Sequence, residues 1–439
     1  MSRQRNWILK VFLNTLGCRL NESEIEQMGR LFRHLGHDIV ESVEDAELCV
    51  INTCAVTNDA GRKSRQLIYQ ASRKAPDAKI FVTGCYSEIE REKVEEIPGV
   101  VDVISNMEKD SLVPKVLQLE GKEAYDLEPL LREIKPGEIG RTRAFIKAQD
   151  GCDNRCTFCV TTIARGAGRS RPLREIISEV NGLYDAGYQE AVLSGVHLGS
   201  YGRDLQEESD LKILVKALLD ETDMPRIRLS SLEPWDIPEG FFTLWEDERL
   251  CRHIHLPLQA GCDATLKRMA RRTRKSAFRG LVEESRSLIP GLAISSDMIV
   301  GFPGETDAEF EETVEFVKEM DFCHMHVFRY SARPGTAAAR MPNQVHGNTR
   351  AERSAVLQEI ARTGRLSFYE QQLGKSVDVL WEQMVDRNEK GFLWQGLTDH
   401  YVRVQMRVPR NLHNLITPVT LQSFTEDQQA LQAVFSTPS

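Results

Sequence analysis

The sequence AFIKAQDGCDNRCTFC, residues 144–159, gives the clearest indication of the fold. Its first residues, Ala144–Lys147, form a short apolar run that predicts a buried strand. Its second half places Cys152, Cys156 and Cys159 in a CxxxCxxC spacing on one short loop. In barrels of alternating strands and helices, ligands bind in the loops at the C-terminal strand ends. The stretch therefore predicts the first strand of such a barrel, followed directly by a metal-binding loop.

Three thiolates on one tight loop can hold three corners of a cubane iron–sulfur cluster and leave its fourth iron without a protein ligand. S-adenosylmethionine (SAM) can chelate such an open iron through its amino and carboxylate groups. An electron from the cluster then breaks a carbon–sulfur bond and yields a 5′-deoxyadenosyl radical. The alternative is a zinc knuckle, but zinc favours CxxC pairs with distant His or Cys ligands. We therefore predict a SAM-cleaving cluster at this loop.

The strand–helix pattern continues on the C-terminal side of this loop. Amphipathic segments such as Leu173–Tyr184 and Glu309–Met320 separate five further apolar runs. These candidate strands are Ala191–Leu193, Ile227–Leu229, His253–Leu256, Leu292–Ser295 and His324–Phe328. Six strands with intervening helices predict a parallel (βα)6 partial TIM barrel, which we place in residues 138–370.

Residues 1–130 predict a separate open α/β domain of Rossmann-like type. Its candidate strands are the buried apolar runs 11–13, 49–51 and 80–82. A helix between the first two strands is expected to begin with a capping box of Asn21 and Glu24 and to end at Gly36. Its apolar face consists of Ile25, Met28, Phe32 and Leu35. The polar stretch Glu128–Gly140 is expected to link this domain to the barrel.

A second set of cysteines is spread through this first domain. Cys18, Cys54 and Cys85 each follow one of the three candidate strands by three to five residues. Parallel strands bring their C-terminal ends to one edge of a sheet, so the three thiols are expected to converge there. We predict a second three-thiolate cluster at this edge. The alternative is three unrelated buried cysteines, since Cys is a common small core residue.

Residues 371–437 change character and predict a small C-terminal β-barrel. Short strand-like runs occur at 377–380, 392–397, 401–406 and 419–424, separated by polar turns. From Gly374 onward, six Lys and Arg face seven Asp and Glu, so the barrel is nearly neutral and a weak electrostatic clamp for RNA. Four aromatic residues, Trp381, Phe392, Trp394 and Tyr401, could stack on bases, but most of them are expected in the barrel core.

The composition is that of a soluble globular protein. The 439 residues are 41% apolar and 28% charged, and no apolar run is long enough for a membrane span. Nothing marks export, which predicts a cytoplasmic protein without membrane contact. The net charge of −9 argues against a protein that coats nucleic acid indiscriminately. The ten cysteines are expected to bind metal or to lie in the core rather than to form disulfides.

The loops that follow the barrel strands supply candidates for a SAM pocket. They carry small and polar residues, as a methionine moiety, a ribose and an adenine would require. The candidates are Ser194 and Gly195 after the second strand, Ser230, Ser231 and Glu233 after the third, Gln259 after the fourth, and Asp297 and Gly301 after the fifth. Each segment by itself is also compatible with an ordinary loop of a strand–helix unit.

Taken in order, these segments resemble the radical SAM methylthiotransferases. The matching segments are NTLGCRLNESE, INTCAVT, VTGCYSE, DGCDNRCTFC, LSGVHLGSYG, RLSSLEP, HLPLQAGCDATLKRM and DMIVGFPGET. The resemblance implies a methylthiotransferase domain, a radical SAM core and a C-terminal TRAM barrel that binds RNA. It also implies two 4Fe–4S clusters, one on Cys152, Cys156 and Cys159 and an auxiliary one on Cys18, Cys54 and Cys85. The chain departs from the family in lacking the usual glycine-rich end of the TRAM barrel.

The resemblance further implies a reaction that uses SAM twice. One SAM methylates a sulfur on the auxiliary cluster, and the other yields the radical that removes hydrogen from an unreactive C–H bond. The methylthio group then passes to that carbon, and the cofactors perform the difficult chemistry while the protein positions the atoms. No acid or base side chain removes such a hydrogen at neutral pH. An external electron donor and an unidentified sulfur donor are implied as well.

The substrate implied most closely is N6-threonylcarbamoyladenosine at position 37, in the anticodon loop of tRNA. The residues that point to this subgroup are Gly17-Cys18-Arg19-Leu20-Asn21 and the basic residue before Ser170-Arg171-Pro172. Alternatives are isopentenyladenosine at the same position, an aspartate of a ribosomal protein, and a non-enzymatic iron–sulfur or zinc module for RNA binding or electron transfer. Two basic runs are candidate RNA surfaces or solvated helix faces: Arg165, Arg169, Arg171 and Arg174, and Lys267, Arg268, Arg271, Arg272, Arg274 and Lys275.

Overall fold

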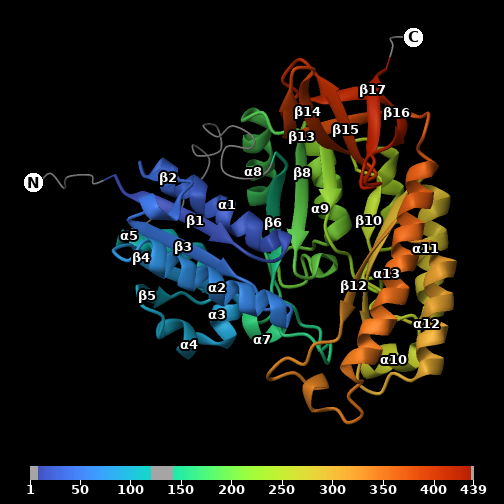
Figure 1. The fold of residues 1–439 in the computed structure, drawn as a ribbon, viewed down its shortest axis with the longest axis horizontal. Coiled ribbons are helices and arrows are strands. Elements are labelled where there is room, and N and C mark those ends of the chain that lie inside the picture. Colours follow the sequence, from blue (N-terminus) through green and yellow to red (C-terminus); the bar gives the residue numbers. More distant parts are fainter. Residues whose placement is uncertain (1–7, 120–141, 437–439) are drawn as a thin grey trace, which may run out of the picture.

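The computed structural model of the chain describes residues 8–119 and 142–436 and shows three parts in chain order (Figure 1). An α/β part at the N-terminus packs beside a central part of strands and helices, and a small β-barrel at the C-terminus packs against that central part. The expected linker Glu128–Gly140, and with it the boundary between the first two domains, lies outside the described residues. Within the described ranges, no helix combines the length and apolar character that a membrane span needs.

The N-terminal part is an open parallel sheet in the order β2-β1-β3-β4-β5, as predicted. Its strands are β1 (Lys10–Thr15), β2 (Asp38–Val40), β3 (Leu48–Thr53), β4 (Lys79–Gly84) and β5 (Val100–Val103). The helices are α1 (Arg19–His34), α2 (Asn58–Lys74), α3 (Cys85–Ile89), α4 (Arg91–Glu95) and α5 (Leu112–Leu117). The edge strands β2 and β5 were not predicted, because neither is a continuous buried apolar run.

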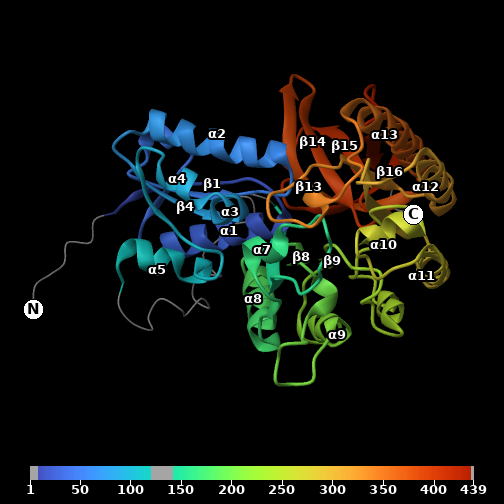
Figure 2. The ribbon, with the colours of Figure 1, turned by 90° about the horizontal axis from the view of Figure 1, so that it is seen from below.

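Helices cover both faces of this sheet, with α1 and α5 on one side and α2 on the other (Figure 2). The side chains of the central strand β3 alternate between the two faces of the sheet. The strand is buried along its whole length because helices cover both faces. Val50 packs in the cluster that contains α1, whereas Cys49 and Ile51 pack in the cluster that contains α2. The strand ends that carry the predicted cysteines point toward the central part.

The predicted capping box at the start of α1 is wrong. The helix begins at Arg19, directly after Cys18, so Asn21 and Glu24 lie inside the first turns and cap nothing. Both side chains are buried and bind Arg165 of the central part instead. The predicted apolar face and the end of the helix before Gly36, which has φ +84°, are confirmed.

The central part has six parallel strands and confirms the predicted partial barrel. The strands are β6 (Ala144–Asp150), β8 (Glu190–Gly195), β9 (Arg226–Leu229), β10 (His253–His255), β11 (Ala293–Val300) and β12 (His324–Arg329). Its helices are α7 (Thr161–Arg165), α8 (Leu173–Asp185), α9 (Leu211–Glu221), α10 (Asp263–Arg268), α11 (Lys275–Leu288), α12 (Asp307–Met320) and α13 (Gly347–Glu370). The short strand β7 (Arg169–Ser170) is an antiparallel edge that the sequence did not predict. Isolated parallel bridges connect β9, and the residues that follow it, with the segment around β10.

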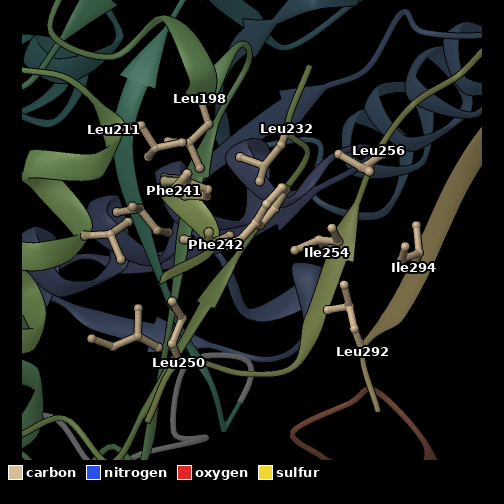
Figure 3. Close-up of a cluster of buried hydrophobic side chains, with 14 of the residues drawn as sticks. Leu198, Leu211, Leu232, Phe241, Phe242, Leu250, Ile254, Leu256, Leu292 and Ile294 are labelled. Atoms are coloured by element: carbon tan, nitrogen blue, oxygen red, sulfur yellow. The ribbon is translucent and has the colours of Figure 1, made fainter. Parts of the chain in front are cut away.

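Alternation along the barrel strands separates an apolar outer layer from a polar lumen. Ile254 and Leu256 point into the apolar cluster between the sheet and its helices, beside Phe241 and Phe242 (Figure 3). Successive side chains of a strand point to opposite faces, so His253 and His255 point to the other side, where they line a cavity.

The C-terminal part is a closed barrel in the order β13-β14-β15-β17-β16. Its strands are β13 (Ser376–Asn388), β14 (Gly391–Thr398), β15 (Arg403–Val408), β16 (Ile416–Phe424) and β17 (Leu431–Phe435). Trp381 and Trp394 lie in its core, as expected, whereas β17 was not predicted. The predicted strand at 401–406 begins only at Arg403, because Tyr401 has φ +67° and turns away from the barrel.

Candidate active site

Cys18, Cys54 and Cys85 lie at the C-terminal ends of β1, β3 and β4, which are neighbours in the sheet. A Cβ atom on Gly17 would lie 2.8 Å from the Sγ atom of Cys54, so the turn before Cys18 lies directly against Cys54. The structure therefore brings the three predicted residues together at one edge of the sheet.

The pKa values of these thiols reflect their shared surroundings. Burial raises the pKa of Cys18; the Arg165 guanidinium opposes this rise, and neighbouring Cys85 adds to it. Burial also raises the pKa of Cys54 to about 11, and Cys18 and Cys85 again add to the rise. Because metals bind thiolates, iron binding at this edge must displace protons from the cysteines.

The loop with the CxxxCxxC motif follows β6 and is held by the backbone around it. Gly151 has φ +69°, and a Cβ atom there would lie 1.9 Å from the carbonyl oxygen of Ala167, so only glycine fits. The amide of Cys152 donates to the carbonyl of Gly166 over 3.0 Å, and the amide of Cys159 donates to the carbonyl of Cys156 over 3.1 Å. Burial raises the pKa of Cys152 to about 12, and Cys159 and Cys156 add to the rise.

A buried arginine connects this loop with a predicted SAM contact. Arg271 Nη1 lies 3.9 Å from Cys156 Sγ, and its Nη2 lies 2.6 Å from a carboxylate oxygen of Glu233. The guanidinium also lies over the ring of Trp235, 4.3 Å from its centroid. Arg271 was expected on an RNA surface, but its side chain is only 2% exposed and lies beside the cysteine loop.

The two triads have the ligand type and number that a cubane cluster with one open iron needs. Among residues 8–119 and 142–436, no three His, Cys, Asp or Glu side chains stand close enough to hold one metal ion. Three thiols on strand ends or on one short loop match three corners of a cubane, whose irons bind separate thiolates.

Some predicted SAM contacts lie near the cysteine loop. Ser194 and Gly195 end β8, and a Cβ atom on Gly195 would lie 3.1 Å from the side-chain oxygen of Gln149 in β6. Ser230 follows β9, and its buried hydroxyl has no partner among the described residues, as is true of the indole nitrogen of Trp235. A buried polar atom without a partner is costly, so these atoms are candidates to bind a polar ligand. The neighbouring Ser231 bridges to His255 through its backbone.

The three other predicted SAM contacts lie in or beside β11, and of these only Asp297 departs from its predicted position. Asp297 does not follow the fifth strand but lies within β11, where it pairs with His255 Nε2 over 3.4 Å. The strand extends further than its apolar start suggested, because alternate residues face the polar lumen. Gly301 is covered by α13, since a Cβ atom there would lie 2.1 Å from Cγ of Arg350. The backbone of Gln259 forms hydrogen bonds with β11 and so extends the sheet beyond the end of β10.

Arg165 joins the two cysteine sites through a buried network. Its Nη2 donates to Asn21 Oδ1 over 2.7 Å, and its Nη1 donates to Glu24 and Asp150 over 2.8 Å each. Asn21 Oδ1 also accepts from Cys18 Sγ over 3.7 Å, and Asp150 accepts from the amide of Gly151 directly before Cys152. Arg165 was expected on an RNA surface, but its side chain is 1% exposed and instead connects the auxiliary site with the CxxxCxxC loop.

Sequence reasoning missed two groups of residues in this region. The first is a cluster of lumen histidines, which the alternating sequences His253-Ile254-His255 and His324-Met325-His326 indicate once these segments are read as buried strands. The second is His197, which lies 3.2 Å from the side chain of Asn154 in the cysteine loop and 2.7 Å from Asp236. No sequence pattern identified the second group.

Comparison with known proteins agrees with this geometry. Residues 10–106 match the family described as uncharacterized protein family UPF0004, and residues 146–317 match the radical SAM superfamily. The threonylcarbamoyladenosine tRNA methylthiotransferase MtaB of Bacillus subtilis (strain 168) is 35% identical over 94% of this chain and 93% of its own length. The tRNA-2-methylthio-N(6)-dimethylallyladenosine synthase of Maricaulis maris (strain MCS10) is 33% identical over 85% of this chain and 87% of its own.

A solved structure shares the fold at low identity. It is the radical S-adenosylmethionine methyltransferase TsrM from Kitasatospora setae with cobalamin and a 4Fe–4S cluster bound, with a TM-score of 0.55 and 15% identity over 76% of this chain and 77% of the other. The paired cysteine sites, the two matched regions and the full-length similarity to methylthiotransferases agree. The chain belongs to the radical SAM methylthiotransferase family.

Proposed function

We propose that this enzyme adds a methylthio group to C2 of N6-threonylcarbamoyladenosine at position 37 of tRNA. The observation that carries the proposal is the pair of three-thiol sites, which a single buried network through Asn21, Arg165 and Asp150 holds next to each other. Similarity over nearly the full length to an enzyme named for this nucleoside supports the choice of substrate.

Two 4Fe–4S clusters and SAM, when bound, supply the radical and the methylthio group. Cys152, Cys156 and Cys159 would hold the SAM-cleaving cluster, and Cys18, Cys54 and Cys85 the auxiliary one. The hydroxyl of Ser230 is suited to bind the polar part of SAM, and Gly195 leaves room beside Gln149. Arg271 orients Glu233 toward the cysteine loop, where its carboxylate can accept hydrogen bonds from SAM.

Of the two basic runs, Lys267, Arg272 and Arg274 stay exposed candidates for contact with tRNA. Carboxylates pair with the other seven residues of these runs, which are Arg165, Arg169, Arg171, Arg174, Arg268, Arg271 and Lys275. A cavity of about 200 Å³ between α2 and the central part carries four further cations, Arg62, Arg65, Lys93 and Arg333, of which Arg62 pairs with Asp59 and Lys93 with Glu90. Ala55 and Val160, which directly follow Cys54 and Cys159, also line it. We place contacts to the phosphates of the anticodon loop there.

The nearly neutral C-terminal barrel would mainly orient the tRNA. The external electron donor and the cytoplasmic location stay predictions from the sequence.

The second candidate substrate is the dimethylallyl nucleoside, because a relative named for it is nearly as similar. Both substrates can be tested with the reconstituted holoenzyme under anaerobic conditions, SAM and a reductant. We expect methylthiolation of tRNA that carries threonylcarbamoyladenosine, read by mass analysis of digested RNA. Methylthiolation of only the dimethylallyl tRNA would refute the proposed substrate.

Two cysteine variants test the separate roles of the two sites in the same assay. Cys18→Ala is expected to keep the release of 5′-deoxyadenosine and to lose the methylthiolated product, because only the auxiliary site is damaged. Cys156→Ala is expected to lose both. An equal loss of 5′-deoxyadenosine in the two variants would contradict two separate clusters.

A further inference from the structure

A cavity of about 310 Å³ lies between the barrel lumen, the start of α1 and the C-terminal barrel. Its lining includes Arg19, Arg365 and Arg403, together with five histidines. No aspartate or glutamate lines it, although acidic residues outnumber basic ones in the whole chain. The cavity is therefore a local concentration of positive charge in an acidic protein.

The three arginines are not neutralised by the protein. Arg19 is half-buried, and its guanidinium donates to the hydroxyl of Tyr401 over 3.1 Å. Arg365 donates to the carbonyl of Gln428 and to the side chain of Gln429. Across the described part of the chain, none of the three arginines forms an ion pair with a carboxylate. Arg19 and Arg365 are half-buried and Arg403 is exposed, so an anionic group in the cavity would meet three arginines that no carboxylate of the described residues occupies.

Two buried imidazole nitrogens in the same wall also lack partners. They are Nδ1 of His253, whose other nitrogen binds Ser295, and Nε2 of His400, whose other nitrogen binds Asp399. Both residues are almost fully buried. Unsatisfied buried polar atoms of this kind point to a ligand with hydrogen-bonding groups.

Three of the lumen histidines, His253, His324 and His326, have lowered pKa values and are therefore neutral near pH 7. Burial lowers the pKa of His324 to about 4, and neighbouring His326 contributes to the decrease. Burial also lowers the pKa of His326 and that of His253. Neutral imidazoles both donate and accept hydrogen bonds, so they suit hydroxyl and amide groups, while the arginines supply the attraction for an anion.

We propose that this cavity binds the N6 substituent of the target base, with Arg19, Arg365 and Arg403 around its carboxylate. The proposal rests on the proposed function and names the part of the enzyme that selects the substrate. A threonylcarbamoyl group carries a carboxylate, a hydroxyl and amide groups, which match this lining. A dimethylallyl group is apolar and would leave the arginines and the two imidazole nitrogens unsatisfied, so the same lining rejects it.

The position of the cavity agrees with the site of reaction. In adenine, C2 and C6 are both bonded to N1, so a substituent on N6 lies close to C2. Arg19 is the residue directly after Cys18, a predicted ligand of the auxiliary cluster. A base whose C2 faces that cluster therefore places its N6 substituent near Arg19.

The charge of the carboxylate can be tested without catalysis. The reconstituted holoenzyme is titrated with anticodon stem–loop RNA that carries threonylcarbamoyladenosine, its methyl ester or dimethylallyladenosine. A hydrogen-bonded charge typically contributes about tenfold or more to affinity. We expect the acid to bind about tenfold more tightly than the ester, and the dimethylallyl RNA to bind no better than the ester.

Variants then assign this preference to the cavity. Arg19→Gln and the double variant Arg365→Gln/Arg403→Gln are expected to bind acid and ester alike, whereas Arg19→Lys keeps part of the preference. Arg410→Gln is the matched control, because this exposed arginine of the same barrel does not line the cavity. Iron content and 5′-deoxyadenosine release show that each variant is folded and loaded.

The possible failures of the two proposals are distinct. Equal binding of acid and ester by the wild-type enzyme, or a full preference in the cavity variants, would overturn the role of the cavity even if threonylcarbamoyl tRNA is methylthiolated. A wild-type enzyme that methylthiolates no threonylcarbamoyl tRNA would instead refute the proposed function.

Discussion

Arg165 shows how one buried residue can organise two reaction centres. Its guanidinium contacts Glu24 with both nitrogens of its fork and also reaches Asp150, while Lys109 donates to the other side of Glu24. These side chains are almost fully buried, so the charges pair in a region from which water is largely excluded. Buried pairs contribute little net stability, but the loss of one partner is costly because it leaves an unpaired charge.

We therefore expect Arg165→Met to destabilise the protein by roughly 3–5 kcal/mol, as is typical when a buried ion pair loses one partner. The double variant Arg165→Met/Glu24→Gln is expected to lose less than the sum of the single changes, because each single change already breaks the same Arg165–Glu24 pair, while Lys109 loses its carboxylate whenever Glu24 is replaced. Urea midpoints of the wild type and the three variants measure this coupling. Arg174→Met, in the same basic run but on an exposed pair with Glu221, is the control and should change the midpoint little. Additive effects of the two changes would contradict the network.

At the scale of single elements, the turn between β1 and α1 sets the auxiliary site. Gly17 has φ +120°, and a Cβ atom there would lie 2.7 Å from Cβ of Cys54 and 2.8 Å from its Sγ. Gly36 at the other end of α1 also has a positive φ, +84°, but no atom lies within 4 Å of its added Cβ. An alanine at Gly36 would therefore introduce backbone strain alone, whereas an alanine at Gly17 would introduce both backbone strain and a clash with Cys54.

Gly17→Ala is expected to lose the auxiliary cluster while SAM cleavage persists, because the added methyl group displaces Cys54. Gly36→Ala should cost only the backbone strain of a left-handed residue, about 1–2 kcal/mol, and keep both clusters. Iron and sulfide content per chain, together with 5′-deoxyadenosine release, measure the difference. A full iron load in the Gly17 variant would show that Cys54 is not held where cluster binding requires it.

At the scale of the whole molecule, the C-terminal barrel closes the N-terminal ends of the central strands. Arg226 donates to the carbonyls of Leu397 and Asp378 over 3.1 and 2.8 Å. Its neighbour Arg228 donates to the carbonyls of Thr398 and Asp399 and pairs with the buried Glu190. These contacts fix the barrel against the enzyme core and leave the opposite strand ends to the cysteine loop.

Arg226→Met is expected to loosen this attachment, since two carbonyls lose a charged donor. Trypsin should then cleave faster after the exposed Lys375, between α13 and β13, and release residues 376–439. The rate of release by mass spectrometry is the measurement. Arg387→Met, on the exposed part of β13, is the control and should leave the rate unchanged. Equal rates in both variants would mean that other contacts carry the attachment.

Sequence patterns predicted the architecture because buried parallel strands are apolar runs and cysteine spacing is explicit. They failed where an interaction is made across domains. The run from Arg165 to Arg174 looks like a basic surface, yet Glu24 and Asp150, which pair with Arg165, come from distant segments. Asn21 and Glu24 matched a capping box for the same reason, since the competing partner is invisible in local sequence. Asp297 was assigned to a loop because a polar residue in a strand lining a lumen resembles the end of that strand.

Helix α1 has a consequence for how the substrate enters. Besides Asn21 and Glu24, it bonds the central part through Ser23, which donates to the carbonyl of Phe145, and through Arg30, which pairs with Glu179. A single helix bonded along its length to the central part in this way ties the two cysteine sites to one rigid element. We therefore expect the two sites to keep their relative position when RNA binds. The nucleotide itself must then swing out of its stack and travel into a preformed chamber.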